Sequence, residues 1–147
     1  MIESRSGSIF EVEAEALVNP VNCIGVSGAG LAKQFKDAYP ANFELYNAVC
    51  GKGKLKIGQI LVTQIRVEPR CYIVNLPTKI HWKDPSQLFW VHRGLIALLR
   101  WARREHIQSI AMPRIGCGLG GLPWPEVRTL IVRIFGPVKF VKVILLE

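Results

Sequence analysis

Residues 112–122 read Met-Pro-Arg-Ile-Gly-Cys-Gly-Leu-Gly-Gly-Leu and place four glycines within the six positions 116–121. An apolar run at 109–112, typical of a short buried strand, comes before them, and Pro125 suits the first turn of a helix after them. Glycine permits positive φ and a close approach of backbone to ligand. A glycine-rich loop between a strand and a helix predicts an α/β fold with backbone N–H groups that face an anion.

A second loop of this kind lies at residues 19–30, which read Asn-Pro-Val-Asn-Cys-Ile-Gly-Val-Ser-Gly-Ala-Gly. No Gly-Lys-Ser/Thr follows it, and its glycines lack the spacing of the dinucleotide fingerprint, so neither nucleotide motif is present. The alternative is a strand-to-helix turn that needs glycines for its shape alone. Two such loops at one sheet edge could hold the two phosphates of a pyrophosphate.

Strand-like and helix-like segments alternate along the chain. We expect strands at 16–18 (ending at Asn19-Pro20), 57–64, 71–76, 109–112 and 139–146. We expect helices from Gly30, after Pro40, from a Ser86 cap to 105–106, and from Pro125 to 136. The pattern predicts a largely parallel sheet covered on both faces. Ligands bind beyond the carboxyl ends of such strands, where loops 19–30, 77–82 and 113–122 would meet.

Length and composition fit one domain, residues 1–147, with half of its residues hydrophobic. The chain has no apolar run near the ~18 residues of a membrane helix and no signal-peptide layout at its start, so we expect a soluble, cytoplasmic protein, a monomer by default. The four cysteines form no CxxC pair and have no histidine at zinc spacing. We therefore expect small buried side chains and no metal site.

The net charge of +8 and the isoelectric point near 9.6 favour a polyanionic partner, either nucleic acid or a phosphate-bearing ligand. Basic residues cluster at Lys52, Lys54 and Lys56 and again at 100–104. The alternative is a solvated surface with a basic bias, because the second cluster falls on a helix that can simply face water.

The segments 16–22 (Ala-Leu-Val-Asn-Pro-Val-Asn), 28–32 (Gly-Ala-Gly-Leu-Ala) and 112–122 together resemble the macrodomain family in order and spacing along nearly the whole chain. The segment 75–82, Asn-Leu-Pro-Thr-Lys-Ile-His-Trp, is similar to the Asn-Phe-Pro-Thr-Lys-x-His-Trp of the DarG-type antitoxin macrodomains and of the related terminal ADP-ribose glycohydrolase. This resemblance implies a three-layer α/β/α sandwich with a mixed sheet of about six strands. It also implies ADP-ribose as ligand or product, and no cofactor.

The resemblance assigns ADP-ribose contacts to all three loops and to the start of the chain. Asn22 would lie near the distal ribose, and the loop at 116–120 would close over the pyrophosphate. The full set of implied contacts is Ser8, Ile9, Asn19, Asn22, Gly28, Ala29, Gly30, Leu31, Pro77, Thr78, Ile115, Gly116, Cys117, Gly118, Leu119 and Gly120.

Lys79 is the catalytic residue that the resemblance implies. A neutral, desolvated amine could attack the sugar carbon, whereas an ammonium could protonate the departing base or stabilise its charge. His81 could relay a proton, contact DNA or sit in the loop wall. Trp82 could stack a base, although packing beneath the long helix is the plainer expectation. For Trp124 we expect a place in the core.

Two positions depart from the family patterns. The terminal glycohydrolase pairs its lysine with an aspartate in the glycine-rich loop, where this chain has Gly120; DarG-like loops also carry Gly-Gly there. Many macrodomains have Gly-Asp-Ile near the start, where this chain has Gly7-Ser8-Ile9. The shorter, neutral Ser8 implies weaker or water-mediated recognition of adenine.

The expected function is therefore removal of ADP-ribose from thymidine bases in single-stranded DNA, which reverses the action of a DarT-type toxin. Its expected partners are ADP-ribose, ADP-ribosylated DNA and a toxin of that type. Two alternatives stay open at this point: a non-catalytic ADP-ribose reader, and a hydrolase of ADP-ribosylated protein glutamate or O-acetyl-ADP-ribose.

Overall fold

A mixed six-stranded sheet with strand order β1-β6-β5-β2-β4-β3 forms the middle layer of the protein. The computed structural model describes residues 1–147. All neighbouring strands are parallel except β3 and β4, which are antiparallel. The strands are β1 (Ile2–Arg5), β2 (Ala16–Asn22), β3 (Leu61–Arg66), β4 (Cys71–Lys79), β5 (Ser109–Met112) and β6 (Lys142–Leu146).

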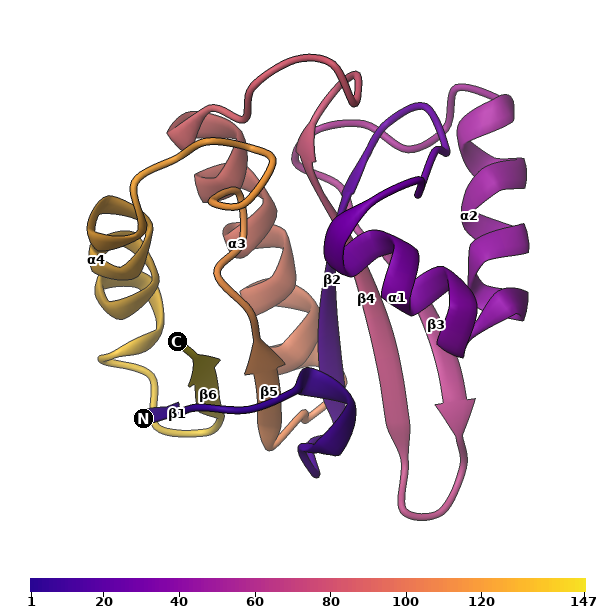
Figure 1. Ribbon diagram of the computed structural model, residues 1–147. Coiled ribbons are helices and arrows are strands. Elements are labelled where there is room, and N and C mark those ends of the chain that lie inside the picture. The colour runs from indigo at the N-terminus through magenta and orange to yellow at the C-terminus, as the bar shows by residue number, and fades with distance from the viewer.

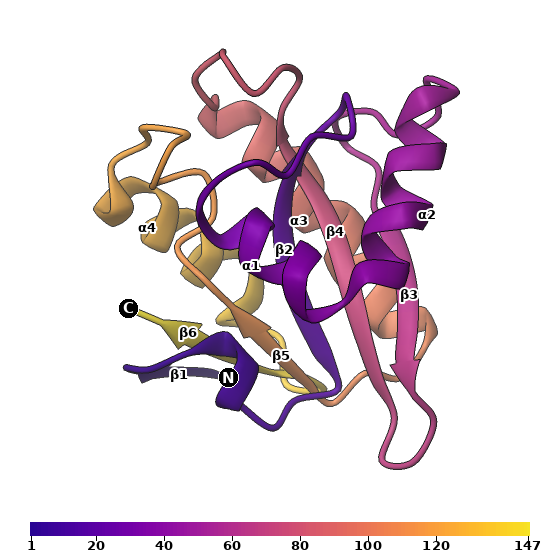
Figure 2. The same ribbon diagram turned by 45° about the vertical axis from the view of Figure 1, so that its right-hand side comes forward.

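Helices cover both faces of this sheet, as Figures 1 and 2 show. The helices α1 (Gly30–Ala38) and α2 (Pro40–Gly51) lie on one face, and α3 (Leu88–Arg104) and α4 (Trp124–Phe135) on the other. A short 3₁₀ helix, η1 (Ile9–Glu11), precedes β2. The α/β/α sandwich expected from the sequence is confirmed.

The strand β2 shows why both faces are covered. Ala16 and Val18 pack into the core under α3 and α4, whereas Leu17 and Val21 point to the face of α1 and α2. Alternate side chains of a strand lie on opposite faces, so a strand buried on both faces carries apolar residues at consecutive positions, as residues 16–18 of β2 do. Gly94 brings α3 close to the sheet, because a Cβ there would lie 2.6 Å from Cδ2 of Leu76.

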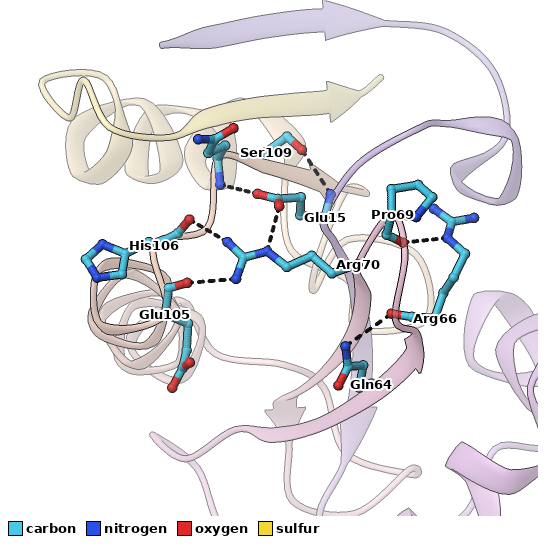
Figure 3. Close-up of polar contacts among 9 residues, drawn as sticks. Glu15, Gln64, Arg66, Pro69, Arg70, Glu105, His106 and Ser109 are labelled. Carbon is cyan, nitrogen blue, oxygen red and sulfur yellow. Dashed lines mark hydrogen bonds and ion pairs between the residues drawn. The ribbon is translucent and has the colours of Figure 1, made fainter.

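At the amino-end edge of the sheet, Arg70 links four segments (Figure 3). Its Nε donates to Glu15 at 2.7 Å, and its two Nη atoms donate to the carbonyl oxygens of Glu105 and His106 at 3.1 and 2.6 Å. The Glu15 carboxylate also accepts from the Gln108 amide at 2.6 Å. We call this group of five residues the Arg70 clasp. It closes the end of α3 against the starts of β2, β4 and β5.

Several expected boundaries were wrong. No strand was expected at Ile2–Arg5, and β3 begins at Leu61 because residues 57–58 form a turn with Gly58 at φ 84°. β4 continues to Lys79 rather than ending at 76, and β6 begins only at Lys142.

The cap of α3 is also a correction. Gln87, not Ser86, is the N-cap residue, and Ser86 is buried against the glycine-rich loop, where its amide donates to the Gly120 carbonyl at 2.9 Å. No helix of the protein combines the length and the apolar character needed to cross a membrane.

Candidate functional site

A cleft of about 850 Å³ opens at the carboxyl ends of β2, β4 and β5. This volume falls within the range of small-molecule sites, about 300–1,000 Å³. The loops that follow these three strands form its walls, as expected from the sequence, and they gather at one end of the sheet in Figure 2. The predicted site residues that line it are Asn22, Gly28, Ala29, Gly30, Leu31, Thr78, Lys79, Trp82, Gly116, Cys117, Gly118, Leu119 and Gly120.

The first wall is folded around the side chain of Asn22. Its Oδ1 accepts from the amides of Ile24, Gly25 and Val26 at 3.1–3.3 Å, and its Nδ2 donates to the Val26 carbonyl at 2.8 Å. The hydroxyl of Tyr46, on α2, donates to Asn22 from below, 2.7 Å from Oδ1 and 2.8 Å from the carbonyl oxygen. One buried amide therefore fixes the path of the loop before a ligand arrives.

Gly25 allows this path, because its φ is +86° and a Cβ there would come within 3.1 Å of Cys50. Burial raises the pKa of Tyr46 far above its ordinary value and that of Cys50 to about 11, so both side chains stay neutral at physiological pH. The loop then enters α1 at Gly30, whose first-turn N–H groups and helix dipole suit a phosphate.

The opposite wall is the loop at 116–120. Gly116 has φ +74°, and the Leu122 amide donates to its carbonyl at 2.9 Å. A Cβ on Gly120 would overlap both Ser86 Oγ and the Gly116 carbonyl. No residue with a side chain fits at Gly120 while the loop keeps this path, so the absence of an aspartate there is built into the loop.

Lys79, the last residue of β4, joins two of the walls. Its Nζ donates to the carbonyl oxygen of Trp82 at 3.2 Å and to that of Leu119 at 3.5 Å. An ammonium has three N–H groups, so one remains for a ligand in the cleft. Lys79 and Arg114 are the only charged residues among those that line the cleft.

The cleft therefore holds two cations and no carboxylate, a balance that favours a phosphate-bearing ligand. No group of three His, Cys, Asp or Glu side chains in the protein is arranged to hold a metal ion.

The turn at 81–84 carries His81 and Trp82 at the cleft mouth. Trp82 lines the cleft and is 50% exposed, so the expectation that it packs beneath α3 is wrong. His81 does not line the cleft; its Nδ1 accepts from the Lys83 amide at 3.1 Å, and its ring lies 5.5 Å from the Trp82 ring. His81 thus shapes the turn that presents both the Trp82 ring and the Trp82 carbonyl that holds Lys79.

Other residues assigned through the resemblance lie outside the lining. Ser8 caps η1 by accepting from the Phe10 amide at 3.2 Å, and Ile9 is buried in the core. Pro77 and Ile115 are also buried and do not line the cleft. Asn19 donates to Asn75 at 3.0 Å. Their roles toward ADP-ribose stay predictions.

The cysteines match the expectation only in part. All four are free, Cys50 and Cys71 are buried, and Cys23 and Cys117 are half-buried. Cys117 lines the cleft, where burial raises the pKa of its thiol. Trp124 packs against the main core, as expected, while its Nε1 donates to Glu147 at 2.9 Å.

Sequence reasoning missed several residues that shape the cleft. Arg114 could have been found, because it is the only charge in the glycine-rich segment. It lines the cleft, and its guanidinium lies 5.6 Å from the Trp124 ring centroid. Tyr46 and Ser86 had no such signal, since a helix-face tyrosine and a loop serine look ordinary in a sequence.

The Macro domain family matches residues 18–131, and the chain belongs to this family. It is 43% identical over 136 residues to a protein of Mycobacterium tuberculosis named DNA ADP-ribosyl glycohydrolase, covering 92% of this chain and 39% of that protein. It is 42% identical to the protein of the same name from Thermus aquaticus, covering 97% of this chain and 40% of that protein. The chain thus spans about two fifths of the length of these relatives.

Two solved structures are similar over the whole chain. The macrodomain of Mycobacterium tuberculosis DarG superposes with a TM-score of 0.96 at 40% identity, covering 100% of this chain and 97% of that one. The macrodomain of Thermus aquaticus DarG gives 0.93 at 42% identity, covering 100% and 98%. Thermosipho africanus DarTG, solved in complex with ADP-ribose, gives 0.88 at 28% identity, covering 98% of this chain and 41% of that one.

Proposed function

We propose that this chain hydrolyses the glycosidic bond between ADP-ribose and a thymine base in single-stranded DNA. The observation that carries the proposal is Lys79, which joins two loops of a cleft that contains no carboxylate. The names of the relatives from Mycobacterium tuberculosis and Thermus aquaticus support DNA as the carrier of the ADP-ribosyl group. A Thermosipho africanus relative, named as a fusion of a DNA ADP-ribosyl transferase with the glycohydrolase, supports a DarT-type toxin as the functional partner.

The two glycine loops would hold the pyrophosphate of ADP-ribose from opposite sides. Gly28 to Gly30 offer backbone N–H groups at the start of α1, and the 116–120 loop offers its own from across the cleft. Asn22 already fixes the first of these loops, which lowers the ordering cost of binding. The distal ribose would then lie toward Asn22 and Lys79.

Hydrolysis at this position breaks the bond between the anomeric carbon of the ribose and the base nitrogen, while water adds to that carbon. Negative charge develops on the departing base, which takes up a proton. The Nζ of Lys79 donates to two carbonyl oxygens and keeps one N–H free, an arrangement that suits it to stabilise or protonate the base. We therefore favour the acid or electrostatic role over nucleophilic attack.

The exposed ring of Trp82 would stack on a base beside the modified nucleotide. Lys83 lies 5.3 Å from this ring, so one turn offers a stacking surface and a cation for a phosphate. The Trp82 carbonyl also accepts a hydrogen bond from Lys79, so a DNA strand bound to this turn would affect the position of the catalytic amine.

Release of ADP-ribose tests the proposal on two substrates, a thymidine oligonucleotide and a glutamate-containing peptide, both ADP-ribosylated. We expect release from the oligonucleotide at a rate at least tenfold above that from the peptide. Release from the peptide alone would make the chain a protein-directed hydrolase. Calorimetric binding of ADP-ribose without release from either substrate would make it a reader.

A further inference from the structure

A second hollow, of about 450 Å³, lies between the edge strand β3 and the helix α3. It shares no lining residue with the cleft. Its walls combine apolar side chains with two arginines, and the lining residues are Ile60, Val62, Ala97, Arg100, Trp101 and Arg104. We call it the α3 groove.

The arginines of this groove belong to a longer stripe on α3. Phe89, Arg93, Ala97, Arg100 and Arg104 follow one another at spacings of three or four residues, which places them on one face of the helix. At about 1.5 Å per residue, the stripe from the first arginine to the last extends roughly 16 Å. All three arginines are exposed.

No acidic residue of α3 or β3 balances these charges, because neither element contains an Asp or a Glu. Arg93 lies 6.0 Å from the Phe89 ring and against Gly58, and Arg100 makes no ion pair. Arg104 approaches Glu105 at 3.5 Å, but both side chains are largely exposed, and such a pair contributes little. The stripe is therefore a line of cations without effective counter-charges.

The stripe begins beside the mouth of the cleft. Figure 1 shows the loop after β4, which carries Trp82, running directly into the first turn of α3 at the cleft end of the sheet. Phe89, in that first turn, is 64% exposed. Exposed aromatic rings at the cleft end, followed by spaced arginines, form the combination that holds single-stranded nucleic acid.

We propose that the α3 groove and its arginine stripe bind the phosphate backbone of the single polynucleotide strand whose modified base occupies the cleft. This inference rests on the proposed function. The guanidinium groups would pair with successive phosphates, and Phe89 would stack a base between the cleft and Arg93.

The test is the binding of a fluorescent oligothymidylate of about 12 nucleotides, a length within the usual site sizes. Anisotropy titrations compare wild type, the groove variant R100Q/R104Q and the control R103Q/R133Q. The control removes the same charge from exposed positions: Arg103 lies off the stripe, 5.4 Å from the Phe140 ring, and Arg133 is on α4. Surface substitutions of this kind should leave all three proteins equally folded by thermal unfolding.

We expect the groove variant to bind roughly tenfold more weakly and to lose about 1.4 from the slope of log affinity against log salt, about 0.7 for each phosphate contact. The control should change affinity less than about twofold. Equal losses of affinity in the groove variant and the control would show that only the net charge matters, which would overturn the inference. Unchanged binding in the groove variant would also overturn it.

Release of ADP-ribose from the modified oligonucleotide separates this inference from the proposed function. If wild type binds the oligonucleotide through the α3 groove but releases no ADP-ribose, the proposed reaction is wrong and the inference about the groove holds. If wild type and the groove variant release ADP-ribose equally well at limiting substrate, the reaction stands and the groove fails.

Discussion

The two ends of the sheet are built in opposite ways. At the amino-end edge, the Arg70 clasp joins its segments through side-chain hydrogen bonds that pair its polar groups with one another. At the carboxyl-end edge, Asn22 and the glycines shape loops whose backbone N–H groups and two cations face open space. The difference teaches that stability and ligand binding are assigned to opposite ends of the same strands.

The charges of the loops follow the same division. Loops 23–29, 52–60, 80–87 and 113–123, together with Lys79, contain one acidic residue, Asp84, and six basic ones: Lys52, Lys54, Lys56, Lys79, Lys83 and Arg114. The loops at the amino-end edge contain Glu13, Glu15, Glu68 and Glu105 against Arg70 and Lys139. The basic bias at the cleft end would draw a polyanion there rather than to the clasp.

Loss of Lys79 should give the largest effect and should affect the cleft end alone. K79A removes the group proposed to act on the departing base, so we expect ADP-ribose release to fall at least about a hundredfold. Binding of free ADP-ribose should stay within several-fold by calorimetry, and the free energy of unfolding should not change.

K139A is the control, because it removes an exposed lysine at the amino-end edge of the sheet that does not line the cleft. Release by K79A at the rate of K139A would remove Lys79 from the mechanism.

Loss of Arg70 should affect only the amino-end edge of the sheet. R70A leaves the Glu15 carboxylate without its cation and two carbonyl oxygens at the end of α3 without their donor. We expect the free energy of unfolding, measured by urea titration, to fall by about 2 kcal/mol. The release rate per folded molecule should match wild type.

R66A controls for the loss of an exposed arginine nearby, whose Nε donates only to the Pro69 carbonyl. It should cost less than about 0.5 kcal/mol. A slower rate of ADP-ribose release by folded R70A would show that the two ends of the sheet are coupled. It would contradict the separation of stability from ligand binding.

A methyl group on Gly120 should disturb the cleft by displacing the backbone of the 116–120 loop. The Cβ of G120A would overlap Ser86 Oγ and the Gly116 carbonyl, so the loop must move, and we expect calorimetry to show ADP-ribose bound roughly tenfold more weakly.

G118A adds the same methyl group two residues away, where nothing lies within 4 Å, and it should bind within about twofold of wild type. If G118A weakens binding as much as G120A, crowding by the ligand rather than loop geometry is the cause.

The smallest effect concerns pH. Burial by itself raises the pKa of Glu15, but the hydrogen bonds from Arg70 and the Gln108 amide outweigh it, so the pKa lies below its ordinary value. A depressed carboxyl pKa stabilises the fold above the unfolded-state pKa, about 4.3, and this contribution is lost as pH falls below it.

E15Q should therefore lose less stability than wild type when urea titrations are taken from pH 6 to pH 3, a difference of less than about 1 kcal/mol. Equal losses of stability in the two proteins would mean that protonation of Glu15 does not contribute to the acid sensitivity of the fold.

The loops that form the cleft could be predicted from the sequence, whereas the Arg70 clasp could not. Glycine spacing and strand ends predicted which loops meet, because parallel strands bring their carboxyl ends to one edge. Arg70 gave no signal, since its partners Glu15 and Glu105 are far away along the chain and only the fold brings them together. Ser86 was misjudged for the same reason: contact with the distant Gly120 loop overrides its local preference for a helix cap.

The crowding around Gly120 also restricts how this chain could evolve. A single mutation cannot add a carboxylate opposite Lys79, because Ser86 and the Gly116 carbonyl already occupy the space of the new Cβ. Replacement of Ser86 by glycine would remove only one of the two obstacles. A lineage that acquires an aspartate at position 120 from this chain must first reroute the loop, so the two loop designs are separated by several coupled substitutions.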